Sequence, residues 1–192
     1  MELLVGATLS AALMAGVLSS YIYLGRSLGR LANQQSLDVE ARRTLAYFTR
    51  DVQSASALTG TLSATSVAFL VPTSGTSNTV TYYFNDTSSS ATVSINGTNV
   101  AMAANALTRC VYDGTNVTSV TLLRNITSSG LNINYYDGTG NAYTSYTNYL
   151  TGIKQLALQF STQAGVAASG TQTLVYNVAS SRLVLRNRPY LQ

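Results

Sequence analysis

Residues 2–24 have the sequence ELLVGATLSAALMAGVLSSYIYL, in which Glu2 is the one charged residue. About 20 apolar residues are enough for a helix to cross a hydrocarbon core of roughly 30 Å. A carboxylate at the end of such a helix is unfavourable unless it is protonated or paired. The stretch therefore predicts a membrane-length helix in which Glu2 has a functional partner.

A signal peptide and a plain membrane anchor both fit this stretch less well. A secretory signal peptide begins with basic residues and has a shorter apolar core, whereas here the first arginine, Arg26, follows the apolar run. A plain membrane anchor would place Arg26 and Arg30 in the cytoplasm by the positive-inside tendency. It would also leave Glu2 without a role and put a Thr- and Tyr-rich remainder inside the cell, so we expect a specialised helix.

The composition indicates an extracellular β-rich domain. Only 9% of the 192 residues are charged, against a usual fraction of about a quarter. Thr, Ser, Asn, Gly and Tyr replace the missing charge, and the length allows one domain with its own core beyond the helix. The net charge of +4 arises from 11 dispersed cations, so no specific nucleic-acid partner is expected.

The helix is predicted to continue from the apolar run to about Leu58, because no proline interrupts it before Gly60. Its second half repeats apolar residues at the i, i+4, i+7, i+11 spacing of one helix face. The residues of this face are Ala41, Leu45, Phe48, Val52 and Ala55. We expect Leu45, Phe48 and Val52 to pack on the domain. The charged residues expected mainly off this face are Arg42, Arg43, Arg50 and Asp51.

Small residues recur along the apolar half, among them Gly6, Ser10 and Gly16. Small side chains let membrane helices approach closely. They are also common in membrane helices that make no such contact. Together with Glu2 and the amphipathic extension, they favour helix–helix packing between copies of the chain.

From residue 63 onward the apolar period changes to two, which is typical of strands. The candidate strands are 66–71, 79–84, 91–95, 107–112, 117–124, 131–136, 153–161, 172–178 and 182–185. Asn96-Gly97, Asp113-Gly114 and Asp137-Gly138 are turn signals. The predicted fold class is α+β, a long N-terminal helix packed on an antiparallel β-sheet head. Its parts are a hydrophobic helix (1–25), an amphipathic helix half (26–58) and a β-rich head (59–192).

The residues predict no enzyme, no cofactor and no metal site. The chain has no histidine, which removes the usual general base and metal ligand near neutral pH. The segments 113–116 (DGTN) and 137–141 (DGTGN) offer oxygens to calcium but lack further acidic ligands, so tight turns are favoured. Cys110, the single cysteine, is expected to be an inert buried thiol.

Two surface features remain open. The 13 tyrosines fit strand propensity better than a sticky contact surface. Four Asn-x-Thr sequons permit glycosylation, at Asn85, Asn96, Asn116 and Asn125.

Glu2 followed by Leu-Leu-Val-Gly resembles the N-terminus of the type IV pilin and pseudopilin superfamily. In that family a leader peptidase cuts before a segment of the type Phe-Thr-Leu-x-Glu-Leu-Leu-Val and methylates the new N-terminus. Met1 would occupy the x position if the leader and the Phe lie upstream of it. The alternative is that the mature chain begins at Met1 and that Glu2 is displaced relative to the family pattern. The segments EARRTLAYFTRDVQSA, VAFLVP, TVTYYF, LTRCVYDG and SRLVLRNR resemble the minor-pilin and minor-pseudopilin branch.

The resemblance implies a structural subunit of an extracellular filament that is held in the inner membrane before assembly. Met1 and Glu2 would be its assembly residues, with Glu2 neutralising the N-terminal ammonium of a neighbouring copy in a low-dielectric setting. The implied partners are other copies of the chain, the prepilin peptidase and the pilus assembly machinery. A minor pseudopilin of a type II secretion system and a membrane-tethered surface β-domain that binds a ligand or glycan are the alternatives.

Overall fold

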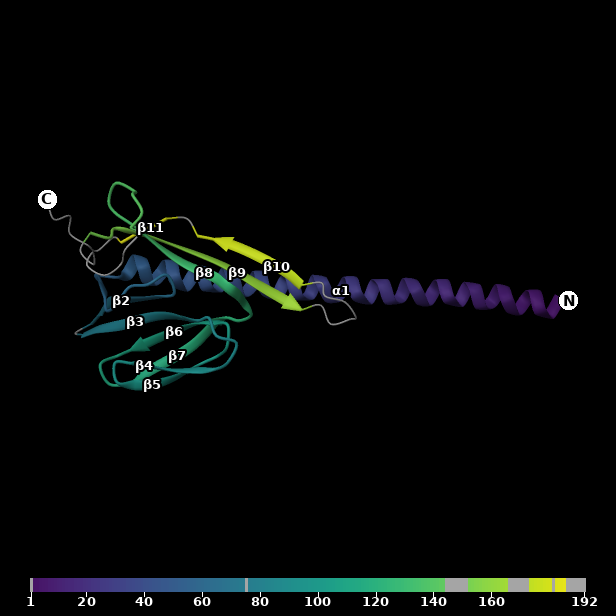
Figure 1. Ribbon diagram of the computed structural model, residues 1–192, viewed down its shortest axis with the longest axis horizontal. Coiled ribbons are helices and arrows are strands. Elements are labelled where there is room, and N and C mark those ends of the chain that lie inside the picture. The colour runs from purple at the N-terminus through teal and green to yellow at the C-terminus, as the bar shows by residue number, and fades with distance from the viewer. Residues whose placement is uncertain (1, 75, 144–151, 166–172, 181, 186–192) are drawn as a thin grey trace.

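The computed structural model describes residues 2–74, 76–143, 152–165, 173–180 and 182–185. Within these residues one helix, α1 (Glu2–Ser54), is followed by strands alone (Figure 1). The strands are β1 (Ala57–Thr59), β2 (Ser66–Thr73), β3 (Thr76–Asn85), β4 (Ala91–Ile95), β5 (Thr98–Met102), β6 (Ala106–Tyr112), β7 (Val117–Leu123), β8 (Ile126–Tyr136), β9 (Gln155–Gly165), β10 (Thr173–Ala179) and β11 (Leu183–Val184).

The strands form three antiparallel sheets. The first has the order β1-β2-β3-β6-β7, the second joins β8, β10 and β11 to β9, and β4 pairs with β5 as a separate hairpin. Asn96 and Gly97 connect β4 to β5 with φ values of 48° and 82°, the left-handed conformations that this tight turn requires. The α+β prediction, a long helix packed against antiparallel sheet, is confirmed.

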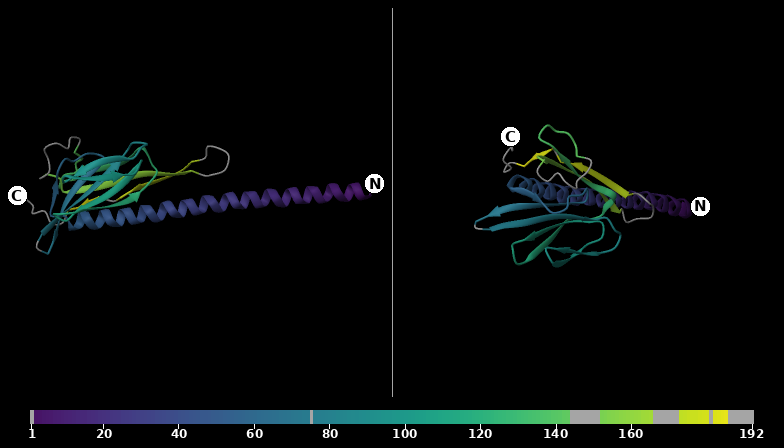
Figure 2. Two further views of the ribbon diagram at one scale, coloured as in Figure 1. Left: turned by 90° about the horizontal axis from the view of Figure 1, so that it is seen from below. Right: turned by 60° about the vertical axis from the view of Figure 1, so that its left-hand side comes forward.

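The head lies along the C-terminal half of α1, and the N-terminal half projects beyond it (Figures 1 and 2). A stripe on the C-terminal half is buried under the two larger sheets. It comprises Leu37, Ala41, Thr44, Phe48, Asp51 and Val52, and Ala55, just after the helix, is buried as well. Phe48 is its centre, because its ring makes edge-on contacts with Phe69 of β2 and Tyr82 of β3 at centroid distances of 6.0 and 5.3 Å. Leu45 packs against the core but is only partly buried.

The prediction that the helix reaches Leu58 is wrong by about one turn. The helix ends at Ser54, and Ala57–Thr59 forms β1 against β2 instead. The backbone N–H of Ser56 donates to the carbonyl oxygen of Leu70 at 2.8 Å. Pairing with β2 therefore replaces the hydrogen bonds that another helical turn would have made. The second helix half ends accordingly at residue 54.

The predicted strands all correspond to observed ones, with shifts at their ends. β4 has the predicted bounds, whereas β8 begins at Ile126, five residues before the predicted strand. The sequence prediction lacked β1 and β5. Both are short, and β5 carries only two buried apolar side chains, Val100 and Met102.

Candidate functional site

The projecting half of α1 exposes an all-round apolar surface. From Leu3 to Leu24 every large apolar side chain is exposed. By length and composition α1 qualifies as a membrane-spanning helix, and none of its apolar window is buried by the rest of the described chain. This part of the helix therefore needs lipid or protein around it.

The apolar surface does not end where a bilayer would end. About 20 residues fill a hydrocarbon core, which the run up to Leu24 already provides. Beyond it Leu28, Leu31 and Val39 are 65%, 51% and 64% exposed. The head leaves this face of the helix uncovered, although it already buries Leu37 on the same stretch of helix.

The small residues of the apolar half leave room for a close neighbour. A methyl group added at Gly6 or Gly16 would meet no atom within 4 Å. The Ser10 hydroxyl donates to the carbonyl oxygen of Gly6 at 2.9 Å, and the Ser20 hydroxyl donates to that of Gly16 at 3.0 Å. Because these hydroxyls are satisfied within the helix, they demand no water from outside it. The predicted contact between copies stays a prediction.

The two predicted assembly residues are only partly placed. The backbone of Glu2 begins α1, but its side chain and the whole of Met1 lie outside the described residues. The pairing of Glu2 with an ammonium group of another copy stays a prediction.

Asp51 is a site residue whose place the sequence pattern does not predict. The helical spacing puts it off the buried face, yet it is 3% exposed. Its Oδ2 accepts hydrogen bonds from the Tyr82 hydroxyl at 2.7 Å and from Arg109 Nε at 2.6 Å. Its Oδ1 accepts from Arg109 Nη2 at 3.1 Å. The forked arginine contact compensates the carboxylate charge and fixes the helix to the sheet.

The register of the first sheet creates this contact. Tyr82 of β3 and Arg109 of β6 are directly paired across the two strands, so both side chains reach the same helical turn. Burial, followed by the negative charge of Asp51, raises the pKa of Tyr82. Burial alone would lower the pKa of Arg109, but the hydrogen bond and charge of Asp51 outweigh it and raise that pKa. One signal was present in the sequence, because Asp51 follows Phe48 by three residues and so lies beside it.

Arginines gather around Tyr47 next to this ion pair. The guanidinium carbons of Arg43, Arg50 and Arg109 lie 5.6, 5.2 and 5.5 Å from the centroid of its ring. These distances are in the range of cation–π attraction. The side chains of Arg43 and Arg50 are exposed, as the sequence predicted, so the cluster forms a basic surface at the edge of the head.

The four sequons differ in access. Asn96, Asn116 and Asn125 are exposed. Asn85 is 3% exposed, and its Nδ2 donates to the carbonyl oxygens of Ser89 and Ala103 at 3.0 and 2.9 Å. Glycan addition at Asn85 in the folded protein is therefore contradicted, because its amide nitrogen is buried and occupied.

The two DG segments form turns closed by their own aspartates. Asp113 Oδ1 accepts from the N–H groups of Thr115 and Asn116, and Asp137 Oδ1 accepts from those of Thr139 and Asn141. Backbone hydrogen bonds, that of Asn116 first, lower the pKa of Asp113. The Thr139 hydroxyl and the backbone of Asn141 lower the pKa of Asp137 to about 2. Both segments therefore form the tight turns that the sequence favours over calcium-binding loops.

Cys110 is buried, as predicted. It packs with Ile95, Val100 and Met102 beneath the β4–β5 hairpin. Burial raises the pKa of its thiol to about 11, so the thiolate that would react is scarce near neutral pH.

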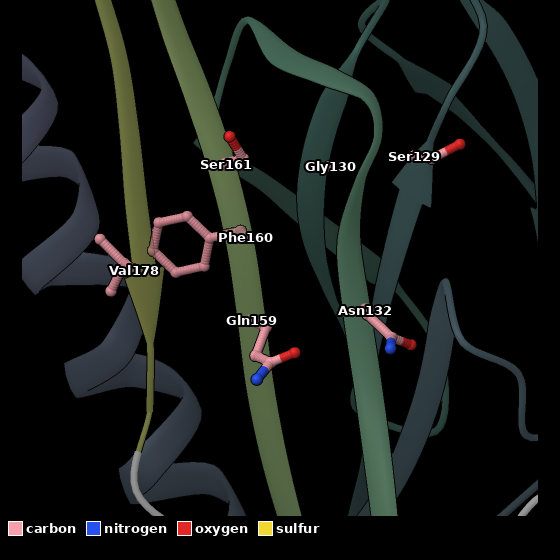
Figure 3. A pocket seen from close by; sticks show the side chains of 7 residues that line it. All are labelled: Ser129, Gly130, Asn132, Gln159, Phe160, Ser161 and Val178. Atoms are coloured by element: carbon pink, nitrogen blue, oxygen red, sulfur yellow. The ribbon is translucent and has the colours of Figure 1, made fainter.

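A hollow of about 400 Å³ lies on the second sheet where β8 bulges away from β9 (Figure 3). Gly130 is required there, because an added methyl group would come within 2.0 Å of the Thr127 hydroxyl oxygen. Asn132 Nδ2 donates to Asn134 Oδ1 at 3.0 Å, and Asn134 Nδ2 donates to Gln159 Oε1 at 3.3 Å. The lining is uncharged and comprises Ser129, Gly130, Asn132, Gln159, Phe160, Ser161 and Val178.

Comparison of the chain with protein-family models, with curated proteins and with solved structures gives no match. The resemblance to the pilin superfamily therefore enters only as a proposal.

Proposed function

We propose that this chain is a structural subunit of an extracellular, type IV pilus-like filament, polymerising through the N-terminal half of α1. The observation that carries the proposal is the apolar surface that continues past a bilayer's reach, at Leu28, Leu31 and Val39. A tethered binding domain needs only the apolar run and a linker. A subunit whose helix is enclosed by other helices needs apolar surface further along, where the lipid has ended.

The exposed first half and docked second half of α1 fit a subunit that moves from the membrane into a filament. In the membrane, lipid covers residues 2–24. In the filament, helices of other copies replace the lipid and also cover the exposed face beyond it. The docked second half holds the head at a fixed angle to this helix, so the heads would repeat regularly around the filament.

In this proposal Glu2 pairs with the N-terminal ammonium of a neighbouring copy and sets the register of addition. The prepilin peptidase and the pilus assembly machinery enter as partners through the resemblance of the N-terminal motif alone. The protein has no enzymatic role in this proposal, and it moves from the inner membrane to the cell surface.

The test replaces Leu31 and Val39 together by Gln in the full chain. Both side chains are exposed in the subunit, so membrane insertion and thermal stability should match wild type. Filaments sheared from the cell surface should be strongly reduced at equal expression. Val120→Gln is the matched control, because Val120 is an exposed apolar residue of the head at 43%. Wild-type filament yield from the double variant would overturn the helix-core proposal.

The uncharged hollow of Figure 3 favours a second candidate, a membrane-tethered β-domain that binds a neutral ligand such as a glycan. Amide and hydroxyl groups without a charged side chain among them suit a neutral, polyhydroxylated molecule better than a charged one. Gln159→Ala would then abolish binding on a glycan array while filament yield is unaffected. An array on which wild type binds nothing above background contradicts this candidate.

A further inference from the structure

The basic surface around Tyr47 has more positive charge than the fold needs. Three guanidinium groups, those of Arg43, Arg50 and Arg109, surround one ring. One carboxylate, that of Asp51, lies among them. Arg109 and Tyr82 donate hydrogen bonds to its oxygens, and Arg50 Nε forms a longer ion pair with its Oδ1 at 3.5 Å. Three positive charges therefore share one negative charge in this cluster.

The accessible pair within this cluster is Arg43 and Arg50. Arg109 is directed inward, with 14% of its side chain exposed, whereas 63% of the Arg50 side chain is exposed. Within the described residues Arg43 forms no ion pair, although Arg42 beside it is paired with Asp38 at 2.8 Å. The Arg43 and Arg50 guanidiniums lie 5.6 and 5.2 Å from the centroid of one ring, so an anionic group placed beside that ring would be attracted by both.

Tyr47 preorganises the pair. The residues Arg43, Tyr47 and Arg50 follow at i, i+4 and i+7 on one helix face, and the half-buried ring is fixed by its contact with the core. Each guanidinium is planar and offers paired N–H donors, which match two oxygens of a carboxylate, sulfate or phosphate group. Side chains already drawn towards a fixed ring by cation–π attraction lose less freedom when they bind.

We propose that Arg43 and Arg50, positioned on Tyr47, form a binding site for one oxyanionic group of the carboxylate, sulfate or phosphate class. The group lies between the two guanidiniums and receives their N–H donors. This inference is independent of filament formation, because the site is complete within one copy of the chain. The oxyanionic group is either a carboxylate on a second copy of the chain or a free anion.

The test uses the full chain in a non-ionic detergent, with sodium sulfate as the probe. The thermal midpoint is followed against sulfate concentration at constant ionic strength, with chloride as the replaced anion. Wild type should show a saturable increase over chloride. Arg43→Gln and Arg50→Gln should each weaken the apparent sulfate affinity at least tenfold, and Arg50→Lys should be intermediate because it retains the charge without the planar fork.

Arg42→Gln is the matched control, because it removes one charge from the same helical turn outside the cluster. A purely structural role for the arginines would change the midpoint without sulfate but not its dependence on sulfate. The proposal is overturned if wild type shows no saturable sulfate effect, or if Arg42→Gln weakens it as much as Arg43→Gln does.

A second measurement identifies the source of the anion. Sedimentation of wild type at low ionic strength, with and without sulfate, shows whether the probe competes with self-association. If sulfate dissociates wild type, and Arg43→Gln is already dissociated without it, the site takes a carboxylate of a second copy. If saturable binding leaves self-association unchanged, the site takes a free anion. Both results support the site.

Discussion

Between Leu3 and Leu24 α1 exposes twelve large apolar side chains, whereas from Leu37 to Val52 most of the apolar residues are buried or half-buried against the sheets. The two regions belong to one uninterrupted helix. Full burial of one such side chain contributes about 1.5–3 kcal/mol. Twelve of them amount to on the order of 20 kcal/mol, more than the whole net stability of a typical domain, about 5–15 kcal/mol. The first half is therefore built for surroundings that one copy cannot supply.

The second half of α1 has its packing partner, the β-sheet head, within the same chain. Phe48 contacts Phe69 of β2 and Tyr82 of β3, and Asp51 accepts hydrogen bonds from Tyr82 and from Arg109 of β6. This half of the helix therefore contributes to the stability of the head. The fold of the head and the proposed assembly would therefore depend on different halves of α1. Mutations in the two halves should therefore affect different measurements.

The largest expected effect comes from deleting residues 1–25. The remaining chain keeps the whole buried stripe, so it should be soluble, monomeric and β-rich. Membrane association and filament formation should be lost completely. Circular dichroism and sedimentation check the fold and the monomer. Filaments formed by this fragment would show that the apolar half is not the polymerising element.

Phe48→Ala should cost about 3–5 kcal/mol of unfolding free energy, as a buried aromatic-to-small change. The ring is fully buried between Phe69 and Tyr82, so its loss leaves a cavity under the first sheet. The corresponding change in the other half, Leu13→Ala, should leave the unfolding free energy of the head unchanged. Urea denaturation followed by near-ultraviolet circular dichroism measures both. Equal effects at the two positions would abolish the distinction between the halves.

Asp51→Asn should cost about 3 kcal/mol, because it leaves the Arg109 guanidinium largely buried without a compensating charge. Asp38→Asn removes the carboxylate of an exposed pair on the same helix, and such pairs contribute about 0–1 kcal/mol. The same denaturation experiment compares the two. A small loss for Asp51→Asn would mean that water or another group replaces the carboxylate.

Some features of the helix and the head could be predicted from the sequence, and others could not. The helix, its buried face around Phe48 and the longer strands could be predicted, since each depends on a local period. For Asp51 the sequence places the residue beside Phe48 but does not reveal its ion pair. That pair depends on Tyr82 and Arg109 being brought opposite each other by the pairing of β3 with β6. The end of the helix could not be predicted either. The N–H group of Ser56 donates to the Leu70 carbonyl oxygen of β2 and not to a carbonyl oxygen of the helix.

The bulge in β8 was also hidden, because residues 127–130 contain Thr, Ser and Gly in an order typical of an ordinary loop. Only the pairing with β9 shows that Gly130 approaches the Ser161 carbonyl oxygen, where an added methyl group would lie at 2.9 Å. The hollow beside it therefore follows from tertiary structure alone. Glu2 is the opposite case, since the sequence alone singles it out and the partner proposed for it belongs to another copy of the chain.

Alkaline pH should loosen the head without affecting the apolar half. Burial raises the pKa of Cys110 from 9.0 to about 11, and it also raises the pKa of Tyr82 from 10.0. A raised folded-state pKa means that the stability from the protonated group is complete below the unfolded-state value and is lost as pH rises. The decline should begin near pH 9, and Cys110→Ala should delay it to about pH 10. Denaturation midpoints at pH 8, 9.5 and 10.5 measure this, and a wild-type midpoint constant up to pH 10.5 would contradict it.

The smallest expected effect is that of Gly16→Ala. This variant should change the stability of the isolated subunit and the filament yield in opposite directions. Alanine is favoured over glycine inside a helix by about 0.8–1 kcal/mol, and an added methyl group at Gly16 meets nothing within 4 Å. The isolated chain in detergent should therefore gain a little helix stability, seen as a slightly higher midpoint of helix melting. In a filament the same methyl group would stand where a neighbouring helix approaches, so filament yield should fall although each subunit is more stable. Gly60→Ala is the control. Gly60 has open space around it but a φ of +70°. Alanine is strained in that conformation, so this variant should lower the stability of the head. If Gly16→Ala raises helix stability and leaves filament yield unchanged, Gly16 faces away from its neighbours and the contact between helices lies on another side of α1.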